Sequence, residues 1–586
     1  MTGEWLATFL LEASKCPAET PEAPEPLPAQ DLDEADTIVR TLGADDFDEK
    51  LAVSEVVRHK IPLLAASAVA RARIRRPGLV GELPLLDQAA ADRRLRMTML
   101  WEEFGAVLAA LNDRGLEPVV LKGPAWATAY YPAPELRSFN DLDLFVPAGQ
   151  LDAYGEALRS MGYSQSTYDP SSGTVRPLAQ ERIAGALATG RHAAPFIRPD
   201  RRAGRAFIVE LHAPGFDENL HRVDTRAFLD DSLPWDTGSG RARRLSPTDD
   251  LIFCAAHLCK DIYVYAPAGR PAAARLNEFC DLRQMLSAGQ EPAAWQRLYE
   301  RAHSLAQCDR VHFAVTHLAR LYPGTVPESL LTPPPQLTRE PEAVIDDVWT
   351  FSRGSSTFRE RLFDPHVDEQ RYIGLRERGE AGGRLEIPPE PETAGTVLSG
   401  VAPAPPWQFF RSHVTYGVAP ESDEEFSAAV SFSHTADQIR VTAHVNDPVQ
   451  VFDKPNGFYH AQDVVQLLFE VPLGSGNVHS IFLVPKAADL PEGAVVEHFS
   501  GLVRAGTETV PGSWLEAAFS PGGYRMRAGI PRTEVLGDIA DGAWFGFDLL
   551  AYESGAQGQE RRCVLQWSGG RNAIRNPAFF GMARLL

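Results

Sequence analysis

Apolar residues recur at helical spacing in two long stretches of the chain, before residue 117 and again from residue 245 to about residue 365. Met97, Leu100, Phe104, Val107 and Leu111 form one such stripe. Residues three or four positions apart lie on one face of a helix. Both stretches therefore predict helices that pack by one apolar face.

Between these stretches, short apolar runs separated by turns replace the helical pattern. The runs at 118–121, 142–146 and 206–214 contain β-branched residues and are too short for helices, so they predict strands. Residues 147–161 are amphipathic and predict one helix. We therefore expect a small mixed sheet here, with helices around it.

From residue 407 onward, apolar and polar residues alternate in short runs, as in FSAAVSFSHTADQIRVTAHVNDP. About nine such runs with regular turns predict an all-β sandwich. The residues just before them are rich in Gly, Pro and Glu, which favours an extended linker. The expected fold is α+β followed by a β-sandwich, divided into helical 1–117, mixed-sheet 118–244, helical 245–370, linker 371–406 and sandwich 407–586.

Two acidic residues interrupt the second strand run. Asp141 and Asp143 stand on either side of Leu142, and residues two apart in a strand project to the same face. Carboxylates this close repel each other and raise each other's pKa unless a cation lies between them. The pair is therefore a candidate magnesium site.

A Lys122-Gly123 turn closes the first strand. The backbone amides of a glycine turn that leads into a helix suit a phosphate group, although Gly123 would also serve to permit a tight turn. Lys122 and Arg137 are candidate phosphate ligands. The alternative for both is a structural ion pair with Asp141 or Asp143.

The residues Leu121, Lys122, Gly123, Tyr131, Pro132, Arg137, Asp141, Leu142 and Asp143 follow one another in the order of a known signature. With them the segment resembles the nucleotidyltransferase superfamily with a polymerase-β-type palm. Within it, the segment is most similar to a branch of uncharacterised bacterial proteins with Leu-Lys-Gly and Asp-Leu-Asp motifs. The resemblance implies that 118–244 is the palm, that Asp141 and Asp143 hold metal ions, and that the turn faces the nucleotide phosphates. Pro124 stands where the wider superfamily has a serine.

The resemblance also implies a third carboxylate on a later strand, and Glu210 fits that place. Glu210 and His212 are two residues apart in the run at 206–214 and share one face of it. With Asp141 and Asp143, Glu210 would complete the oxygen-rich site that Mg²⁺ prefers, and it is also a candidate general base. His212 is either a structural hydrogen-bonding residue or a base or phosphate contact.

The C-terminal segment contains Val445-Asn446-Asp447, Gly523-Tyr524, Gly546-Phe547-Asp548 and Trp567-Ser568-Gly569 in this order. With them it resembles the sandwiches of carbohydrate-binding module family 9 and of DOMON-like proteins. Such modules stack sugar rings on aromatic faces, which makes Tyr459 and Trp567 candidate sugar-binding residues. A place in the core is the alternative for Trp567, and Asp447 and Asp463 are either loop caps or ligands of a structural cation.

Composition narrows the range of partners. The net charge of the 586 residues is −21, whereas a nucleic-acid binder needs clustered Lys and Arg. DNA is therefore disfavoured, while a local basic groove would still allow RNA. No run approaches the roughly 20 apolar residues of a membrane span, so we expect no membrane contact. The six cysteines are scattered, which predicts a reduced, cytoplasmic protein.

The combined prediction is a Mg²⁺-dependent nucleotidyltransferase that moves a nucleotidyl group from an NTP to a hydroxyl-bearing small molecule, glycan or protein. Two Mg²⁺ ions are expected, with Mn²⁺ as the alternative. An inactive scaffold whose sandwich binds a glycan is the second hypothesis. A phosphotransferase or toxin-like modifier of RNA or protein is the third.

Overall fold

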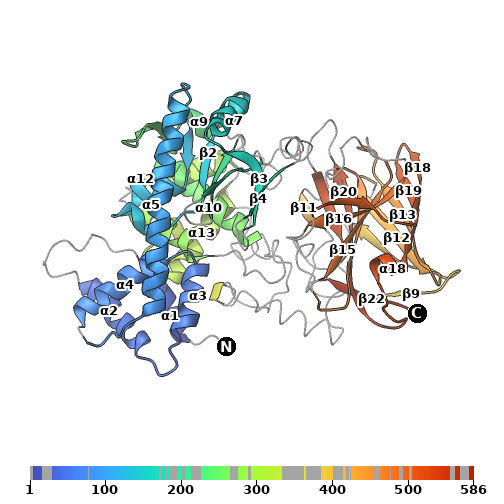
Figure 1. Ribbon diagram of the computed structural model, residues 1–586, viewed down its shortest axis with the longest axis horizontal. Helices are drawn as coiled ribbons and strands as arrows, with labels where there is room; N and C mark the ends of the chain where they lie inside the picture. Colours follow the sequence, from blue (N-terminus) through green and yellow to red (C-terminus); the bar gives the residue numbers. More distant parts are fainter. Residues whose placement is uncertain are drawn as a thin grey trace.

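A computed structural model gives the fold of the chain. It describes residues 4–15, 29–76, 78–169, 174–178, 183, 194–200, 205–212, 226–263, 275–287, 292–305, 307–332, 362–363, 384–399, 414–417, 422, 424–452, 462–475, 477–486, 493–500, 505–554, 561–567 and 580–586. Figure 1 shows a helix-rich part at the N-terminal end of the chain and a β-sandwich at the C-terminal end.

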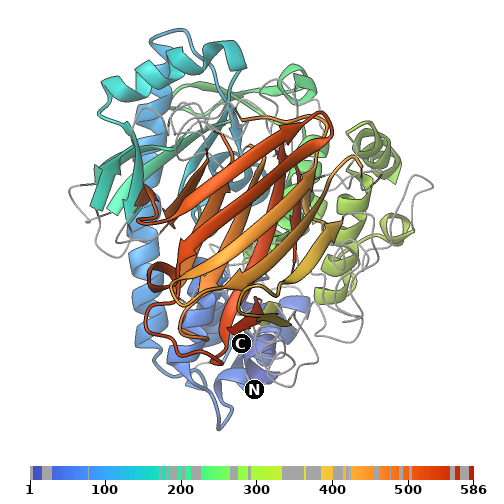
Figure 2. The same ribbon diagram turned by 90° about the vertical axis from the view of Figure 1, so that its right-hand side faces the viewer.

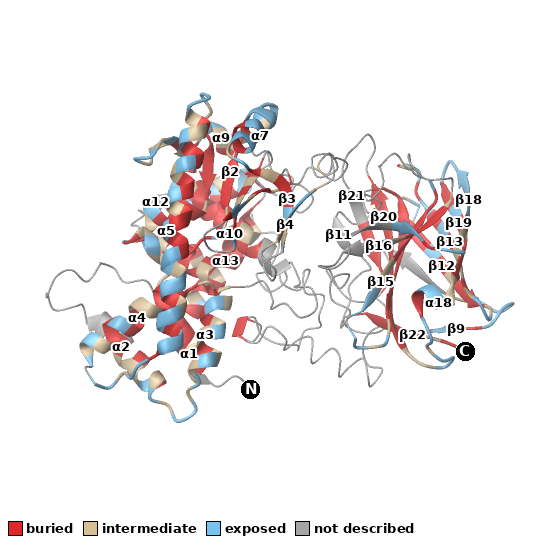
Figure 3. Ribbon diagram, in the orientation of Figure 1, coloured by how far each residue is buried: buried red, intermediate tan, exposed pale blue. Residues whose placement is uncertain are grey.

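The N-terminal helices are α1 (Glu4–Ala13), α2 (Ala29–Leu42), α3 (Glu49–Arg58), α4 (Pro62–Arg75) and α5 (Pro84–Asn112). The Asp48 side chain begins α3 by accepting a hydrogen bond from the Leu51 amide at 3.1 Å. The apolar stripe predicted for α5 is buried, while other faces of this 29-residue helix are exposed (Figure 3). The predicted helical pattern is therefore confirmed for α5.

The next region forms an eight-stranded mixed sheet with the strand order β4-β3-β5-β6-β2-β1-β8-β7. Its strands are β1 (Val119–Leu121), β2 (Leu142–Phe145), β3 (Ser164–Asp169), β4 (Thr174–Pro177), β5 (Phe196–Asp200), β6 (Arg205–His212), β7 (Leu233–Asp236) and β8 (Arg241–Arg244). The helices between them are α6 (Gly123–Tyr130), η1 (Pro134–Leu136), η2 (Ala148–Gln150), α7 (Leu151–Ser160) and α9 (Arg226–Asp230). In the middle of the sheet, β2 runs antiparallel to β1 and parallel to β6.

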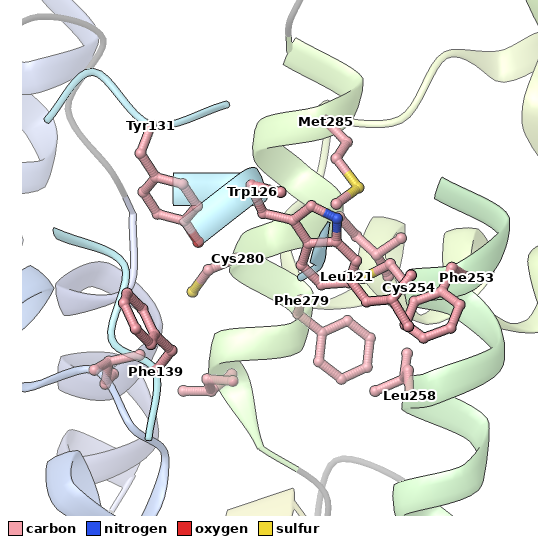
Figure 4. Close-up of a cluster of buried hydrophobic side chains, with 14 of the residues drawn as sticks. Leu121, Trp126, Tyr131, Phe139, Phe253, Cys254, Leu258, Phe279, Cys280 and Met285 are labelled. Carbon is pink, nitrogen blue, oxygen red and sulfur yellow. The ribbon is translucent and has the colours of Figure 1, made fainter. Parts of the chain in front are cut away.

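A second group of helices follows the sheet: α10 (Pro247–Tyr263), α11 (Leu276–Ser287), α12 (Pro292–Ser304), α13 (Cys308–Leu321) and α14 (Glu328–Leu331). One hydrophobic core joins them to the sheet and to α1–α5. In Figure 4, Trp126 of α6 lies beside Phe253 of α10, and the two ring centroids are 6.3 Å apart. The three segments 1–117, 118–244 and 245–370 therefore contribute to one structural body.

The β-sandwich consists of two sheets with a core of their own. The five-stranded sheet contains β10 (Ala394–Ser399), β12 (Ser427–His434), β13 (Gln438–Asn446), β19 (Gly523–Pro531) and β18 (Trp514–Ser520). The nine-stranded sheet contains β11 (Val414–Gly417), β21 (Arg561–Gln566), β20 (Phe545–Ser554), β14 (Val464–Glu470), β15 (Val478–Val484), β16 (Ala494–Ser500), β17 (Ala505–Thr509), β22 (Gly581–Leu585) and β9 (Arg384–Ile387). A short helix, α18 (Arg532–Val535), follows β19. Figure 2 shows these strands lying side by side in two layers.

The linker predicted at 371–406 is partly wrong. Within it, β9 pairs in parallel with β22, and β10 pairs antiparallel with β12 over six residues. Leu385 and Ile387 of β9 are buried in the sandwich core. The sandwich therefore begins by residue 384, ahead of the predicted boundary at 407.

None of the helices in the described part of the chain is both long enough and apolar enough to cross a membrane.

Candidate functional site

The turn between β1 and α6 places two residues in the left-handed region of backbone conformation. Lys122 has φ 44° and Gly123 has φ 45°. Glycine adopts such values at little cost, whereas a lysine there is strained and depends on its surroundings to hold it. The strain fixes the direction in which the Lys122 side chain leaves the turn.

The parallel pairing of β2 with β6 brings two of the predicted carboxylates together. Asp143 and Glu210 are register partners on the two strands, so both side chains leave the same face of the sheet. Ligand atoms of Asp143, Glu210 and His212 lie within 4.8 Å of one another. The sequence predicted that Asp141, Asp143 and Glu210 converge. The structure brings Asp143 and Glu210 together with His212, and Asp141 is not part of this group.

Asp143 is buried and lies between two nitrogen-bearing side chains. Its Oδ2 is 3.1 Å from Lys122 Nζ, and its Oδ1 is 3.0 Å from His212 Nε2. Burial by itself would raise the pKa of Asp143, but Lys122 and His212 lower it well below its usual range. Asp143 is therefore a carboxylate whose charge Lys122 already balances.

The pKa of Glu210 is shifted in the opposite direction to that of Asp143. Burial and the negative charge of Asp143 raise the pKa of Glu210, and the charge of Asp141 adds to this effect. His212 Nε2 lies 3.6 Å from Glu210 Oε2 and acts in the other direction. Because its side chain is 29% exposed, Glu210 is the member of the cluster that a substrate could reach.

Asp141 lies one residue before β2 and is partly exposed. Its charge acts on Glu210 and on Arg93 of α5, so it lies at the edge of the same site. Arg93 donates to the Phe139 carbonyl and to Asn140 Oδ1, both at 2.7 Å. Arg93 thus holds the segment that leads into Asp141.

Arg137 forms an ion pair with an acidic residue of the second group of helices. Its guanidinium is buried and forms a bidentate ion pair with Asp281 of α11, at 2.8 and 2.9 Å. It also donates to the Gly123 carbonyl at 3.3 Å and lies over the Trp126 ring. The partner is neither Asp141 nor Asp143, so the alternative ion pairs predicted for Arg137 are wrong, while its phosphate contact stays a prediction.

Two residues near the cluster were not among the predicted site residues. His257 Nε2 lies 3.2 Å from Lys122 Nζ, and His257 Nδ1 lies 3.2 Å from Glu278 Oε1. The sequence carries one signal for Glu278: it lies three residues before Asp281, so both acids fall on the face of α11 that also buries Leu282 and Met285. A buried acid on an apolar helix face needs a partner.

The donor atoms of the cluster fit a divalent metal ion. Two carboxylates suit Mg²⁺, which prefers oxygen ligands, and an imidazole beside them is also compatible with Mn²⁺. The ammonium group of Lys122 already places a cation at Asp143, which shows that the position favours positive charge. Asp143 and Glu210, two of the predicted metal ligands, are therefore suited to a divalent metal ion, and Asp141 lies beside them.

Of the two predicted sugar-binding residues, Trp567 is the one that the structure describes. Tyr459 lies outside the described residues. Trp567 is only 5% exposed and packs in the sandwich core, where its ring centroid is 5.6 Å from that of Phe547. Trp567 thus takes the core role that was the alternative in the sequence analysis.

The solved structures to which the C-terminal region is similar include two of a carbohydrate binding module family 9 from Caldicellulosiruptor kristjanssonii, one in complex with cellotriose and one with glucose. The identities are 16% and 14%, and each match covers 35% of this chain. The matches cover 93% and 96% of those chains, with TM-scores of 0.24 and 0.25. Such identities are too low to transfer a ligand from one protein to another.

A comparison with curated proteins gives no match. Residues 45–323 match the model of a protein family described as an uncharacterised nucleotidyltransferase. The matched segment includes the strained turn at Lys122 and the carboxylates of Asp143 and Glu210. Over this segment, slightly less than half of the chain, the protein is therefore similar to the uncharacterised nucleotidyltransferase family.

Proposed function

We propose that the N-terminal body transfers a nucleotidyl group from an NTP to a hydroxyl-bearing acceptor, with release of pyrophosphate, in a reaction that requires Mg²⁺. The observation that carries this proposal is the side-by-side placement of Asp143 and Glu210 on parallel strands. The family match over residues 45–323 supports the reaction class. Asp143, Glu210 and the adjacent Asp141 would hold the metal, with His212 hydrogen-bonded to Asp143.

When bound, Mg²⁺ would neutralise charge that develops on the transferred phosphate. Glu210 accepts the proton of the attacking hydroxyl. Burial and the charge of Asp143 raise the pKa of Glu210 in the site without metal, and its partial exposure gives the acceptor access. The lowered pKa of Asp143 keeps that carboxylate charged at neutral pH.

Lys122 and the turn at Gly123 bind the phosphates of the NTP. The turn opens directly into α6, and amides at the start of a helix attract anions. Pro124 removes one of these amide donors, so the ammonium group of Lys122 supplies much of the attraction. Arg137 contributes indirectly, because its hydrogen bond to the Gly123 carbonyl holds the turn in place.

The test is incubation of the purified protein with each α-³²P-labelled NTP, Mg²⁺ and a cell lysate. We expect label on an acceptor or on the protein itself. Glu210→Gln should reduce the rate by about 100-fold or more through loss of the base, and Asp143→Asn should abolish transfer. Asp152→Asn, which changes an exposed carboxylate on α7, is the matched control and should leave the rate unchanged.

Equal labelling by the Asp143→Asn variant and the wild type would refute the proposal. Label from γ-labelled but not from α-labelled ATP would identify a phosphotransferase instead. If no NTP gives label with any lysate fraction, the scaffold hypothesis replaces the enzyme. Glycan binding by the sandwich remains a prediction from the sequence, and a glycan array probed with the full chain tests it.

A further inference from the structure

A continuous chain of polar contacts leads from the candidate metal site into the helical region. Lys122 Nζ lies 3.1 Å from Asp143 Oδ2 and 3.2 Å from His257 Nε2. His257 Nδ1 lies 3.2 Å from Glu278 Oε1. The side chains come from the β1–α6 turn, β2, α10 and α11, so no local sequence motif explains their meeting.

The contacts determine the protonation state of His257. A lysine ammonium group has hydrogen-bond donors and no acceptor, so His257 Nε2 must accept from it and carries no proton. The imidazole proton therefore lies on Nδ1 and is donated to Glu278, which accepts it. His257 is thus a neutral imidazole whose lone pair faces Lys122, and Glu278 selects this tautomer.

Asp143 and His257 are therefore two acceptors of Lys122 among the described residues, and Asp143 is also a candidate metal ligand. An ammonium group and a divalent cation on the same carboxylate repel each other strongly at contact distance. A metal that binds Asp143 must weaken or displace the Lys122 contact. His257 offers the displaced ammonium group an acceptor that it already touches, and the strained turn keeps the side chain in this region.

We propose that Lys122 is an internal counter-ion that the metal displaces from Asp143, and that His257 and Glu278 hold its ammonium group beside the phosphate-binding turn. Lys122 and the metal then compete for Asp143, and His257 determines how easily the metal displaces the Lys122 ammonium group from Asp143. His257 and Glu278 are positioning residues that act through Lys122. This inference rests on the metal site of the proposed function.

The experiment measures Mn²⁺ affinity of the full-length, metal-free protein by electron paramagnetic resonance, without substrate. Lys122→Met removes the competing charge and should tighten Mn²⁺ binding by about tenfold, the effect of one modest charge repulsion. His257→Phe removes the second acceptor, leaves Lys122 on Asp143 and should weaken binding by about threefold or more. His257→Gln restores an acceptor and should return the affinity toward that of the wild type.

Lys50→Met, which removes an exposed lysine on α3, is the control for lysine loss and should not change Mn²⁺ affinity. Thermal unfolding of each variant shows whether it is folded, and His257→Leu, which also removes the acceptor, replaces His257→Phe if the latter is not. The opposite directions of the Lys122 and His257 effects distinguish competition from a structural role, which would weaken binding in both variants.

Unchanged or weakened Mn²⁺ binding in Lys122→Met would overturn the inference. The proposed metal site has its own test: Asp143→Asn should lose Mn²⁺ binding. If Asp143→Asn binds Mn²⁺ like the wild type, the metal site of the proposed function fails. If Asp143→Asn loses binding while Lys122→Met matches the wild type, only the counter-ion inference fails.

Discussion

At the scale of single residues, the Arg137–Asp281 pair is the buried contact that links the β1–α6 turn to α11. Arg137 and Asp281 are 7% and 1% exposed, and Tyr131 donates a further hydrogen bond to Asp281 at 2.8 Å. Asp281→Asn would leave the guanidinium charge buried without its counter-ion. We expect a loss of about 3–5 kcal/mol in the free energy of unfolding, measured by urea denaturation.

An exposed ion pair of similar geometry gives the control for this prediction. Arg76 contacts Asp36 at 2.8 Å through two nitrogens, but the side chains are 47% and 39% exposed. Asp36→Asn should therefore cost less than about 1 kcal/mol. Equal losses of unfolding free energy in the two variants would mean that burial does not determine how much the Arg137–Asp281 pair stabilises the fold.

The same residues show which side-chain positions can be predicted from the sequence and which contacts cannot. Strand periodicity indicated the faces on which Asp143 and Glu210 lie, whereas the expectation that the two carboxylates meet came from the resemblance to the nucleotidyltransferase superfamily. The partner of Arg137 was not predictable, because Asp281 is 144 residues away along the chain and its pairing depends on how α11 packs. His257 escaped prediction for the same reason, since a histidine on an apolar helix face has no local sign of its partner.

At the scale of elements, the ends of β13 and β14 bring two buried acids together in the sandwich. Asp447 follows β13 and Asp463 precedes β14, and both are fully buried. Burial and the charge of Asp447 raise the pKa of Asp463 from 3.8 to about 9. Asp463 accepts hydrogen bonds from the amides of Ser554 and Val451, which act in the opposite direction.

A raised pKa means that the folded state binds a proton that the unfolded state releases between pH 4 and pH 9. The free energy of unfolding must therefore fall as the pH rises through this window. Asp463→Asn carries no charge and should flatten this dependence, which calorimetric melting of the full chain between pH 5 and pH 9 can measure. Asp437→Asn, at an exposed turn, should keep the wild-type slope; a wild-type slope in Asp463→Asn would contradict the prediction.

The strands themselves were only partly predictable. The alternation in β12 and β13 is regular, and each pairs with its neighbour over its whole length. By contrast, β9 and β10 lie in a segment rich in Pro, Glu and Gly, whose composition favours an extended linker. Their strand structure comes from pairing with β22 and β12, and these partners are distant in sequence.

At the scale of the whole molecule, the chain forms two bodies with separate cores. One core runs from Leu6 to Phe363 and joins all the helical segments to the mixed sheet. The main sandwich core begins at Leu385. The sequence predicted both the helical and mixed-sheet part and the β-sandwich, but the prediction divided the first body into three segments. A change from a helical to a strand pattern shows where one type of element ends, and it does not show which elements share a core.

The separate core predicts that residues 384–586 fold without the rest of the chain, and the position of β9 and β10 predicts where such a fragment must begin. A fragment of residues 407–586 lacks both strands. It leaves β22 and β12 with unpaired edges, which promotes aggregation, and it loses the buried side chains of Leu385 and Ile387, at about 1.5–3 kcal/mol each. We expect the 384–586 fragment to unfold cooperatively by circular dichroism, and the 407–586 fragment to melt at a lower temperature or to aggregate. Identical melting of the two fragments would show that β9 and β10 add nothing to the sandwich and would restore the boundary at residue 407.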